Sequence, residues 1–372
     1  MLFSLLRTTA FRNLADAQTF TAAKDVFLVG ENGQGKTNFL EALYFCAFAS
    51  SFRTDRDSEM AHNAGDIRNK SFSVQVNIEQ SVNDEILVKL EKGKKSIFIN
   101  GKRAEDRKEL LSVAPCIVFC HEDMEFINGS PERRRWFFDQ TLCLYDPVYL
   151  DDFRRYRRVL KSRNTVLRDF AQQKFSGNIS PVLDALDPQL AMYGQRLMEK
   201  RELALKQFSD VLNPLYEEVS GIKGVTVQYI PSWKPETDAL ALLHEKQAAD
   251  ITSGFTLSGP HRDRYVFMQD NGSSHPAEFT GQASTGQRRL LALLLRAAQV
   301  RRFSQMTGLN PILLLDDVLL EMDGGKRSRF LSVLPAYSQA FFTFLPEEPY
   351  ESYRKDDTLI YKVENGQLTA SK

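Results

Sequence analysis

The residues best suited to chemistry form one glycine-rich stretch near the start of the chain. Gly30-Glu31-Asn32-Gly33-Gln34-Gly35-Lys36-Thr37 has the spacing G-x-x-x-x-G-K-[ST], which is typical of a loop that cradles phosphates. Glycines let backbone N–H groups approach a polyphosphate, and a following helix N-terminus adds partial positive charge there. Lys36 is expected to reach the β- and γ-phosphates, and the Thr37 hydroxyl to ligate Mg²⁺. The predicted nucleotide contacts run from Gly30 to Asn38.

A pair of carboxylates follows a short apolar run in the last quarter of the chain. Ile312-Leu313-Leu314-Leu315 leads directly into Asp316-Asp317. An aspartate at the tip of a buried strand can hold Mg²⁺ beside the Thr37 hydroxyl, so Asp316 is predicted to be a metal ligand. Successive strand residues point to opposite faces, so Asp317 is expected to face the other way and to orient an attacking water. Lys36 and Asp317 are therefore the predicted catalytic residues.

A second anion-binding stretch opens an apolar helix predicted over residues 281–303. Ser284-Thr285-Gly286-Gln287 places a serine and a glycine at a helix N-terminus, where backbone N–H groups attract anions. Ser284, Gly286 and Gln287 are therefore predicted to contact nucleotide. The economical arrangement puts one anion site on each partner of a dimer, with ATP between them. Leu320-Glu321-Met322-Asp323 is expected to line the same interface.

The elements that must position these residues can be predicted from periodicity. Residues 26–29 form a buried strand before the phosphate loop, and residues 38–48 a helix after it. Apolar residues alternate from residue 72 to 78, which indicates a half-buried strand, and more antiparallel strands follow at 86–90 and 96–99. Further strands are predicted at the ranges 115–119, 225–229, 265–268, 311–317 and 339–344, of which 339–344 is the last.

Residues 131–218 carry almost no strand signal and are predicted to be helical. Pro214 is expected to kink or restart the last of these helices. The fold class is therefore α/β: a mixed sheet with flanking antiparallel hairpins and an inserted α-helical lobe. The predicted domains are the two halves of a head, residues 1–125 and 223–372, and a helical arm at 126–222.

Composition excludes some classes of protein. The 372 residues are 42% hydrophobic and 26% charged, with a net charge of +0, so nucleic-acid affinity would need a local basic patch. No apolar run reaches the length of a membrane span, and the apolar stretch at the start is too short and too soon polar for a signal peptide to be expected. A cytoplasmic protein without a membrane partner is expected. Cys46, Cys116, Cys120 and Cys143 form no C-x-x-C pair and are expected to be reduced and structural.

Together the phosphate loop, the Ser284 helix start, the Asp316-Asp317 strand and Asp323 resemble the ATP-binding-cassette heads of the SMC and Rad50 group. Further motifs narrow the resemblance to the RecF family of bacterial recombination-repair proteins. These are Phe11-Arg12-Asn13, Ser51-Phe52-Arg53-Thr54, Ile99-Asn100-Gly101-Lys102, Gly129-Ser130-Pro131-Glu132-Arg133-Arg134-Arg135, Leu160-Lys161-Ser162-Arg163-Asn164 and Gly259-Pro260-His261-Arg262-Asp263.

The resemblance implies an ATP- and Mg²⁺-dependent homodimer on double-stranded DNA. It would act with RecR and RecO to help load RecA at gaps, where single and double strands meet. By similarity, Ser284 and Gly286 would contact the γ-phosphate from the opposite subunit. An aspartate at 317, where cassette ATPases commonly have glutamate, suggests slow hydrolysis. No glutamine loop is evident, and Thr343 stands nearest to the position of the usual switch histidine.

A cluster of arginines is the predicted DNA-binding surface. Arg154, Arg157, Arg158 and Lys161 share one face of a helix, and such a basic stripe follows duplex phosphates without reading sequence. The predicted set also includes Arg133 and Arg134. Salt-bridged or solvated arginines are the competing interpretation, because acidic residues lie nearby. His261 is either structural or close to DNA or the dimer interface.

Two other functions use the same phosphate loop. A transporter-associated cassette ATPase would need a membrane partner, and it rarely carries an arginine-rich arm. A small-molecule kinase would have no use for the Ser284 helix start or for paired aspartates followed by Asp323.

Overall fold

The computed structural model describes residues 1–62, 71–80, 84–174, 177–270, 276–318 and 324–371. The chain forms two compact units. Unit 1 consists of residues 1–123 and 303–372, and unit 2 consists of residues 124–302. The sequence predicted an insertion that ends at residue 222, so the observed inserted unit is longer than predicted. Residues 320–323, predicted to line a dimer interface, lie outside the described residues.

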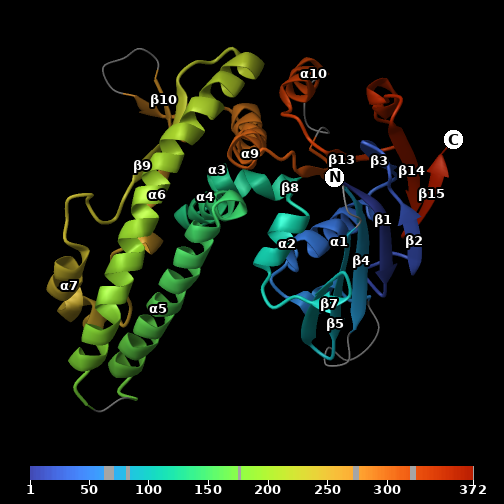
Figure 1. Cartoon of the computed structure of the whole chain (residues 1–372). Coiled ribbons are helices and arrows are strands. Elements are labelled where there is room, and N and C mark those ends of the chain that lie inside the picture. The colour runs from blue at the N-terminus through green and yellow to red at the C-terminus, as the bar shows by residue number, and fades with distance from the viewer. Residues whose placement is uncertain (63–70, 81–83, 175–176, 271–275, 319–323, 372) are drawn as a thin grey trace. The chain divides into compact units, whose positions relative to one another are not determined.

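Unit 1 contains a six-stranded sheet in the order β15-β14-β3-β13-β12-β8 (Figure 1). All neighbouring pairs are parallel except β14 with β15. The strands are β3 (Asp25–Val29), β8 (Cys116–Phe119), β12 (Ile312–Leu315), β13 (Gln339–Phe344), β14 (Thr358–Glu364) and β15 (Gln367–Ser371). Runs such as Val-Phe-Leu-Val are buried on both faces, as expected for strands of a parallel sheet. The phosphate loop and the aspartate pair both follow carboxyl ends of these strands.

A second, antiparallel sheet of unit 1 has the order β2-β1-β4-β5-β6-β7. Its strands are β1 (Leu2–Thr9), β2 (Ala17–Phe20), β4 (Phe72–Glu79), β5 (Asp84–Glu91), β6 (Lys94–Ile99) and β7 (Lys102–Arg103). Helix α1 (Lys36–Phe48) shares one hydrophobic core with both sheets. That position explains why α1 is apolar on nearly all sides. The predicted hairpins are confirmed, and Asn100 and Gly101 form the tight turn between β6 and β7 with positive φ.

The prediction that 339–344 is the last strand is wrong, because β14 and β15 follow it. The missed signal is the alternation of Leu359, Tyr361 and Val363 before Asn365-Gly366, a dipeptide that favours a tight hairpin turn. Three short helices of unit 1 were not predicted either: η1 (Asp57–Met60), α2 (Lys108–Val113) and α10 (Gly324–Val333). η3 (His121–Met124) and η5 (Tyr350–Tyr353) are single turns.

Unit 2 is built around long helices. Helices α5 and α6 pack side by side (Figure 1), and α7 packs on both. The elements are α3 (Glu125–Asn128), α4 (Pro131–Tyr145), α5 (Pro147–Ala171), α6 (Ser180–Ser220), β9 (Val225–Ile230), α7 (Ala239–Ser253), η4 (Pro260–Arg262), β10 (Arg264–Gln269), β11 (Ala277–Glu278), α8 (Phe279–Gln282) and α9 (Thr285–Thr307). Of the two outcomes predicted for Pro214, a kink or a restart, the restart does not occur, because α6 continues through Pro214 to Ser220. The buried stripe of Phe208, Leu212, Leu215 and Val219 outweighs the hydrogen bond that proline removes.

The sequence predicted that the strands β9 and β10 belong to the head, but both lie in the inserted unit 2. β10 pairs with β9 on one side and with β11 on the other in a separate three-stranded sheet, and β9 packs on α6. A strand's own periodicity does not specify its partner, so this assignment required tertiary contacts. The helix predicted at 281–303 is likewise divided, because Ala283 and Ser284 separate α8 from α9.

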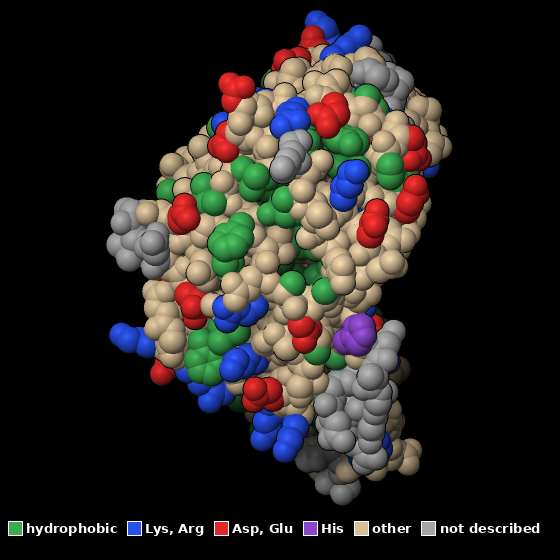
Figure 2. Space-filling model, turned by 90° about the vertical axis from the view of Figure 1, so that its right-hand side faces the viewer, with side chains coloured by type: hydrophobic (Ala, Val, Ile, Leu, Met, Phe, Trp, Pro, Cys, Tyr) green, Lys and Arg blue, Asp and Glu red, His purple; other side chains and the backbone are tan. Residues whose placement is uncertain are grey.

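The face of the molecule in Figure 2 is mixed in charge. Figure 2 shows basic and acidic side chains interspersed over the face in view, in keeping with the net charge of +0. Among the described residues, no helix is both long and apolar enough to span a bilayer. The four cysteines are free, and burial raises the pKa of the Cys46 and Cys116 thiols, which keeps them protonated at neutral pH.

Candidate functional site

The phosphate loop connects β3 to α1, as the motif predicted. Gly35 occupies the N-cap of α1 with φ 118°, and Gly33 has φ 80°. Residues other than glycine rarely adopt these backbone conformations. The Lys36 side chain is buried, and its ammonium donates to the carbonyl oxygens of Gly30 at 2.6 Å and Glu31 at 3.2 Å. The lysine therefore lies along the loop, where it can exchange carbonyl partners for phosphate oxygens.

The turn between β14 and β15 braces this loop. Gly366 donates its backbone N–H to the carbonyl of Gln34 at 2.8 Å, and the N–H of Asn365 bonds the Gln34 side chain at 2.6 Å. A Cβ on Gly366 would lie 1.8 Å from the backbone oxygen of Asn13. The last two strands thus fix the conformation of a loop that lies more than 300 residues earlier in sequence.

The Phe11-Arg12-Asn13 and Ser51-Phe52-Arg53-Thr54 motifs meet beside the same loop. Asn13 donates to the carbonyl of Gly33 at 3.1 Å and accepts from Asn38 at 2.7 Å, and Asn38 accepts from Arg53 at 2.9 Å. Glu41, fully buried on α1, binds Arg12 through two hydrogen bonds of 2.8 Å. Asn38 therefore supports the loop from the side, and Arg53 keeps part of its surface exposed beside it.

The structure brings the predicted metal ligands together. The Thr37 hydroxyl donates to Oδ1 of Asp316 at 2.9 Å, across 279 residues of sequence. Burial, and next the charge of Asp317, raise the pKa of Asp316 to about 7. A divalent cation would reverse this shift, and a hydroxyl beside a carboxylate is the hard-oxygen donor set that suits Mg²⁺.

The orientation predicted for Asp317 is wrong. Strand β12 ends at Leu315, so the alternation of strand side chains no longer applies, and Asp317 has a left-handed φ of 52°. The Thr343 hydroxyl lies 2.9 Å from Oδ1 of Asp317 and 3.3 Å from Oδ1 of Asp316. Both carboxylates therefore face the same hydroxyl at the end of β13.

Sequence reasoning missed a third carboxylate near this site. Glu348 follows β13 in a loop, where Oε2 accepts from the N–H of Leu345 at 2.7 Å and Oε1 lies 3.7 Å from the Arg327 guanidinium. Burial raises the pKa of Glu348, and the charges of Asp317 and Lys36 also influence it. A glutamate in an irregular segment carries no periodic signal, so only the fold could reveal this position.

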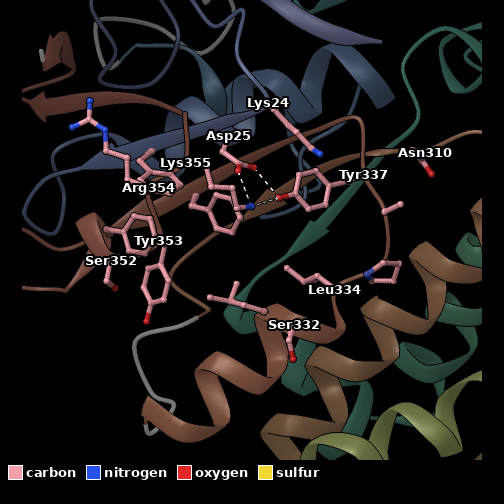
Figure 3. Close-up of a pocket in the computed structure, with 16 residues that line it drawn as sticks. Lys24, Asp25, Asn310, Ser332, Leu334, Tyr337, Ser352, Tyr353, Arg354 and Lys355 are labelled. Carbon is pink, nitrogen blue, oxygen red and sulfur yellow. Dashed lines mark hydrogen bonds and ion pairs between the residues drawn. The ribbon is translucent and has the colours of Figure 1, made fainter. Parts of the chain in front are cut away.

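A cavity of unit 1 lies elsewhere. It has a volume of about 660 Å³ and includes Asp25, Tyr337 and Lys355 at the start of the parallel strands. Figure 3 shows Asp25 joined to Tyr337 and Lys355, with distances of 2.8 and 3.1 Å. The cavity shares no lining residue with the phosphate loop or the aspartate pair, and ligands of open parallel sheets usually bind at the carboxyl ends of strands.

In unit 2, Ser284 caps α9 as predicted for a helix start. Its backbone N–H donates to the Gln287 side chain at 2.7 Å, and the Gln287 N–H reaches the Ser284 hydroxyl at 3.3 Å, which is a reciprocal capping box. Ser284 and Gly286 are exposed. Nothing lies within 4 Å of a Cβ placed on Gly286, and its φ is not positive. The fold of this chain therefore does not itself require glycine there.

The predicted DNA-binding residues divide into two groups. Arg157, Arg158 and Lys161 are exposed on α5 and line a hollow of about 580 Å³ together with Arg168. Within the described part of the chain these three make no ion pair. Arg154 is half-buried on the same face.

Two arginines of α4 differ from each other. Arg133 is exposed and lies 3.9 Å from Glu125. Arg134 is half-buried and donates to three backbone carbonyls, those of Phe126, Ile127 and Tyr265. Arg134 thus ties elements of unit 2 together, which leaves its guanidinium little freedom to bind phosphate.

Two further motifs, residues 160–164 and 259–263, contribute to buried ion pairs that support unit 2 from inside. Arg163 is fully buried and pairs with Asp187 at 2.7 Å and Asp250 at 2.6 Å. Arg201 pairs in the same way with Asp139 and Asp263.

Of the two roles considered for His261, its contacts support the structural one. Its Nδ1 accepts from the Tyr156 hydroxyl at 2.7 Å, and its Nε2 donates to the carbonyl of Thr256 at 3.0 Å. Both ring nitrogens are occupied within unit 2, and burial lowers the pKa of His261 to about 4. The ring is therefore a neutral support for the surrounding loop.

Comparison with known proteins agrees with this arrangement. The sequence model of the family described as "RecF/RecN/SMC N terminal domain" matches residues 3–369. The DNA replication and repair protein RecF of Treponema pallidum (strain Nichols) is 39% identical over 358 residues, which cover 96% of this chain and 97% of that protein. A solved structure of the recombination mediator protein RecF with ATP, from the RecFOR pathway, has a TM-score of 0.86 at 25% identity and covers 100% of this chain and 97% of its own. The Smc head domain of Pyrococcus furiosus, with a TM-score of 0.55 at 15% identity over 99% and 95% of the two chains, shares the fold alone.

The fold and the site define an SMC-type P-loop ATPase head with an inserted helical unit, as the fold class predicted from the sequence. Within that class, the chain belongs to the RecF family of DNA replication and repair proteins. This assignment does not favour the alternative of a transporter-associated ATPase.

Proposed function

We propose that this chain binds ATP and Mg²⁺, dimerises around the nucleotide and hydrolyses it slowly on double-stranded DNA near junctions with single strands. With RecR and RecO it would help load RecA at gaps. The solved structure of RecF with ATP is described as belonging to the RecFOR pathway, and this description supports RecR and RecO as partners. The DNA-repair role of the relatives supports the DNA substrate.

The contact between Thr37 and Asp316 is the observation that carries the ATPase proposal. It joins a phosphate loop to a buried carboxylate at one edge of the sheet. In this arrangement Gly30, Glu31, Asn32, Gly33, Gln34 and Gly35 would wrap the phosphates with backbone N–H groups. Lys36 would exchange the carbonyls of Gly30 and Glu31 for the β- and γ-phosphates.

Thr37 and Asp316 would hold Mg²⁺, which neutralises phosphate charge when bound. Asp317 would orient the attacking water and accept its proton. The Thr343 hydroxyl beside Asp317 restricts where that carboxylate can point.

The second half of the site would come from the partner copy. The exposed Ser284 hydroxyl and the open space at Gly286 support this proposal, since nothing in this chain requires a glycine at that position. Gln287 would hold the serine in place through the capping box. Two copies related by twofold symmetry would then enclose two nucleotides.

On the helical unit, Arg154, Arg157, Arg158 and Lys161 would lie along duplex phosphates, with Arg133 as a further contact. Arg157, Arg158 and Lys161 are exposed and line a hollow, and both observations support this surface. Arg134 is left out of the proposed surface because backbone carbonyls engage its guanidinium.

Turnover and sedimentation test the ATPase proposal together. We expect gapped duplex DNA to stimulate hydrolysis, Lys36→Ala to abolish it, and dimers to form only with ATP and Mg²⁺. Monomers at saturating ATP and Mg²⁺, or unchanged turnover in Lys36→Ala, would contradict the proposal.

A further inference from the structure

Thr343, the fifth residue of β13, holds the second aspartate at two points. The backbone N–H of Asp317 donates to the Thr343 hydroxyl oxygen at 2.7 Å, and that hydroxyl lies 2.9 Å from Oδ1 of Asp317. Thr343 is 4% exposed, so water does not compete freely for these contacts. One hydroxyl therefore accepts from the backbone and donates to the side chain of the same residue.

Each carboxylate of the pair has its own hydroxyl donor. Thr37 donates to Asp316 at 2.9 Å, while the single hydroxyl hydrogen of Thr343 has Asp317 at 2.9 Å and Asp316 only at 3.3 Å. The shorter contact favours donation to Asp317. The two aspartates are thus oriented separately, one from α1 and the other from β13.

The backbone of Asp317 makes such a support necessary. Its φ of 52° is left-handed, which is unfavourable for a residue with a side chain unless local hydrogen bonds compensate. Strand β13 lies next to β12 in the sheet, with Phe342 opposite Leu315. Thr343 is therefore one residue beyond the last paired position, level with the turn that contains Asp317.

We propose that Thr343 is a positioning residue for hydrolysis, which fixes the Asp317 carboxylate at the angle needed to orient water. This inference rests on the proposed role of Asp317. It differs from the role suggested by the position of Thr343 near that of a switch histidine, because the hydroxyl acts through Asp317 and not on the phosphate. Removing it should slow the chemical step and leave nucleotide binding in place.

Thr343→Val removes the hydroxyl and keeps the shape of the side chain. We expect kcat to fall about 10- to 100-fold, with KM and the Kd for a fluorescent ATP analogue within about twofold of wild type, since only the alignment of one reacting group is lost. Thr343→Ser keeps the hydroxyl and should retain most of the turnover. A crystal structure of Thr343→Val should show Asp317 released from its left-handed conformation.

Thr21→Val is the matched control. Thr21 is also fully buried in unit 1, and its hydroxyl donates to the carbonyl of Phe3 at 2.6 Å, away from the site. Thr21→Val loses one buried hydrogen bond and Thr343→Val loses two, so both should lower Tm by a few degrees. Only Thr343→Val should lower kcat.

Wild-type turnover in Thr343→Val, or an equal loss of kcat in Thr21→Val, would overturn the inference. If the valine variant does not fold, Thr343→Ser must exceed Thr343→Ala in kcat by about tenfold, and equal rates would overturn it as well. Asp317→Asn separates the two proposals. An active Asp317→Asn enzyme refutes the proposed role of Asp317, whereas an inactive one beside a fully active Thr343→Val refutes only the role of Thr343.

Discussion

Arginine has two unrelated roles in unit 2, and residue type alone does not separate them. Arg163 and Arg201 are 0% and 2% exposed, and each is held by two carboxylates. Removing one partner of such a buried pair leaves an uncompensated charge, which typically costs about 3–5 kcal/mol. Arg157 and Arg158 lie exposed on the same stretch of α5 as Arg163. Substitution of Arg163 or Arg201 should therefore affect folding, whereas substitution of Arg157 or Arg158 should affect DNA binding.

At the residue scale, His261 should make stability depend on pH. Its folded pKa of about 4 lies below the unfolded value near 6.5, so the unfolded chain binds more protons between these values and stability falls as pH decreases through that window. Between pH 7.5 and 5, the wild type should lose on the order of 1 kcal/mol more than His261→Gln, measured by urea unfolding. His62→Gln, at an exposed histidine of unit 1, is the control. The same pH dependence in wild type and His261→Gln would contradict this account.

Among the elements, the β14–β15 hairpin has a function beyond completing the sheet. Its turn contacts Gln34 through Asn365 and Gly366 and packs against the backbone of Asn13. The phosphate loop is therefore held from three sides: by β3 and α1, by the Asn13–Asn38–Arg53 contacts, and by the final hairpin. A loop fixed before it meets its ligand loses less conformational entropy on binding.

This element-scale argument predicts that Gly366→Ala weakens nucleotide binding at least about tenfold, since the new Cβ would collide with the Asn13 backbone. Gly93→Ala is a matched control. Gly93 has φ 74° against 76° for Gly366, and nothing lies within 4 Å of its Cβ position. Both variants should lose roughly 1–2 kcal/mol of stability for the left-handed conformation. Titration with a fluorescent ATP analogue should separate them, and equal affinities would refute the bracing role.

For the whole molecule, the central question is how two anion-binding stretches in different units cooperate. The phosphate loop belongs to unit 1 and the Ser284 helix start to unit 2. In the proposed dimer, each nucleotide uses Lys36 of one copy and Ser284 of the other. Mutations at these two residues should then complement each other.

A mixture of Lys36→Ala and Ser284→Arg chains tests that arrangement. Each variant alone should be inactive, because both of its sites are damaged. A mixed dimer contains one intact site, so an equal mixture should recover up to about a quarter of wild-type turnover. No recovery in the mixture, with mixed dimers verified by co-purification of differently tagged chains, would argue against shared sites.

DNA binding by the helical unit should depend strongly on salt. Replacing Arg157, Arg158 or Lys161 with alanine should reduce the slope of log K against log salt by about 1 for each phosphate that the protein no longer neutralises, on any duplex sequence. Lys223→Ala serves as a control, since this exposed lysine is not on α5 and already pairs with Glu217 of α6. Affinity measured at two salt concentrations decides the matter, and an unchanged slope in all three variants would rule out this surface.

The sequence alone determined the features that are local. The phosphate loop, the capping serine, the hairpin strands and the Asn100-Gly101 turn depend on residues a few positions apart, so their spacing predicted them correctly. Tertiary structure decided everything that depends on closure of long loops. It placed Thr343 against Asp317, assigned β9 and β10 to the inserted unit, and buried Arg163 while Lys161 and Ser162 stayed exposed. The reason is physical: a residue's type limits which contacts it can make, but its partner is chosen by which distant strand or helix packs beside it.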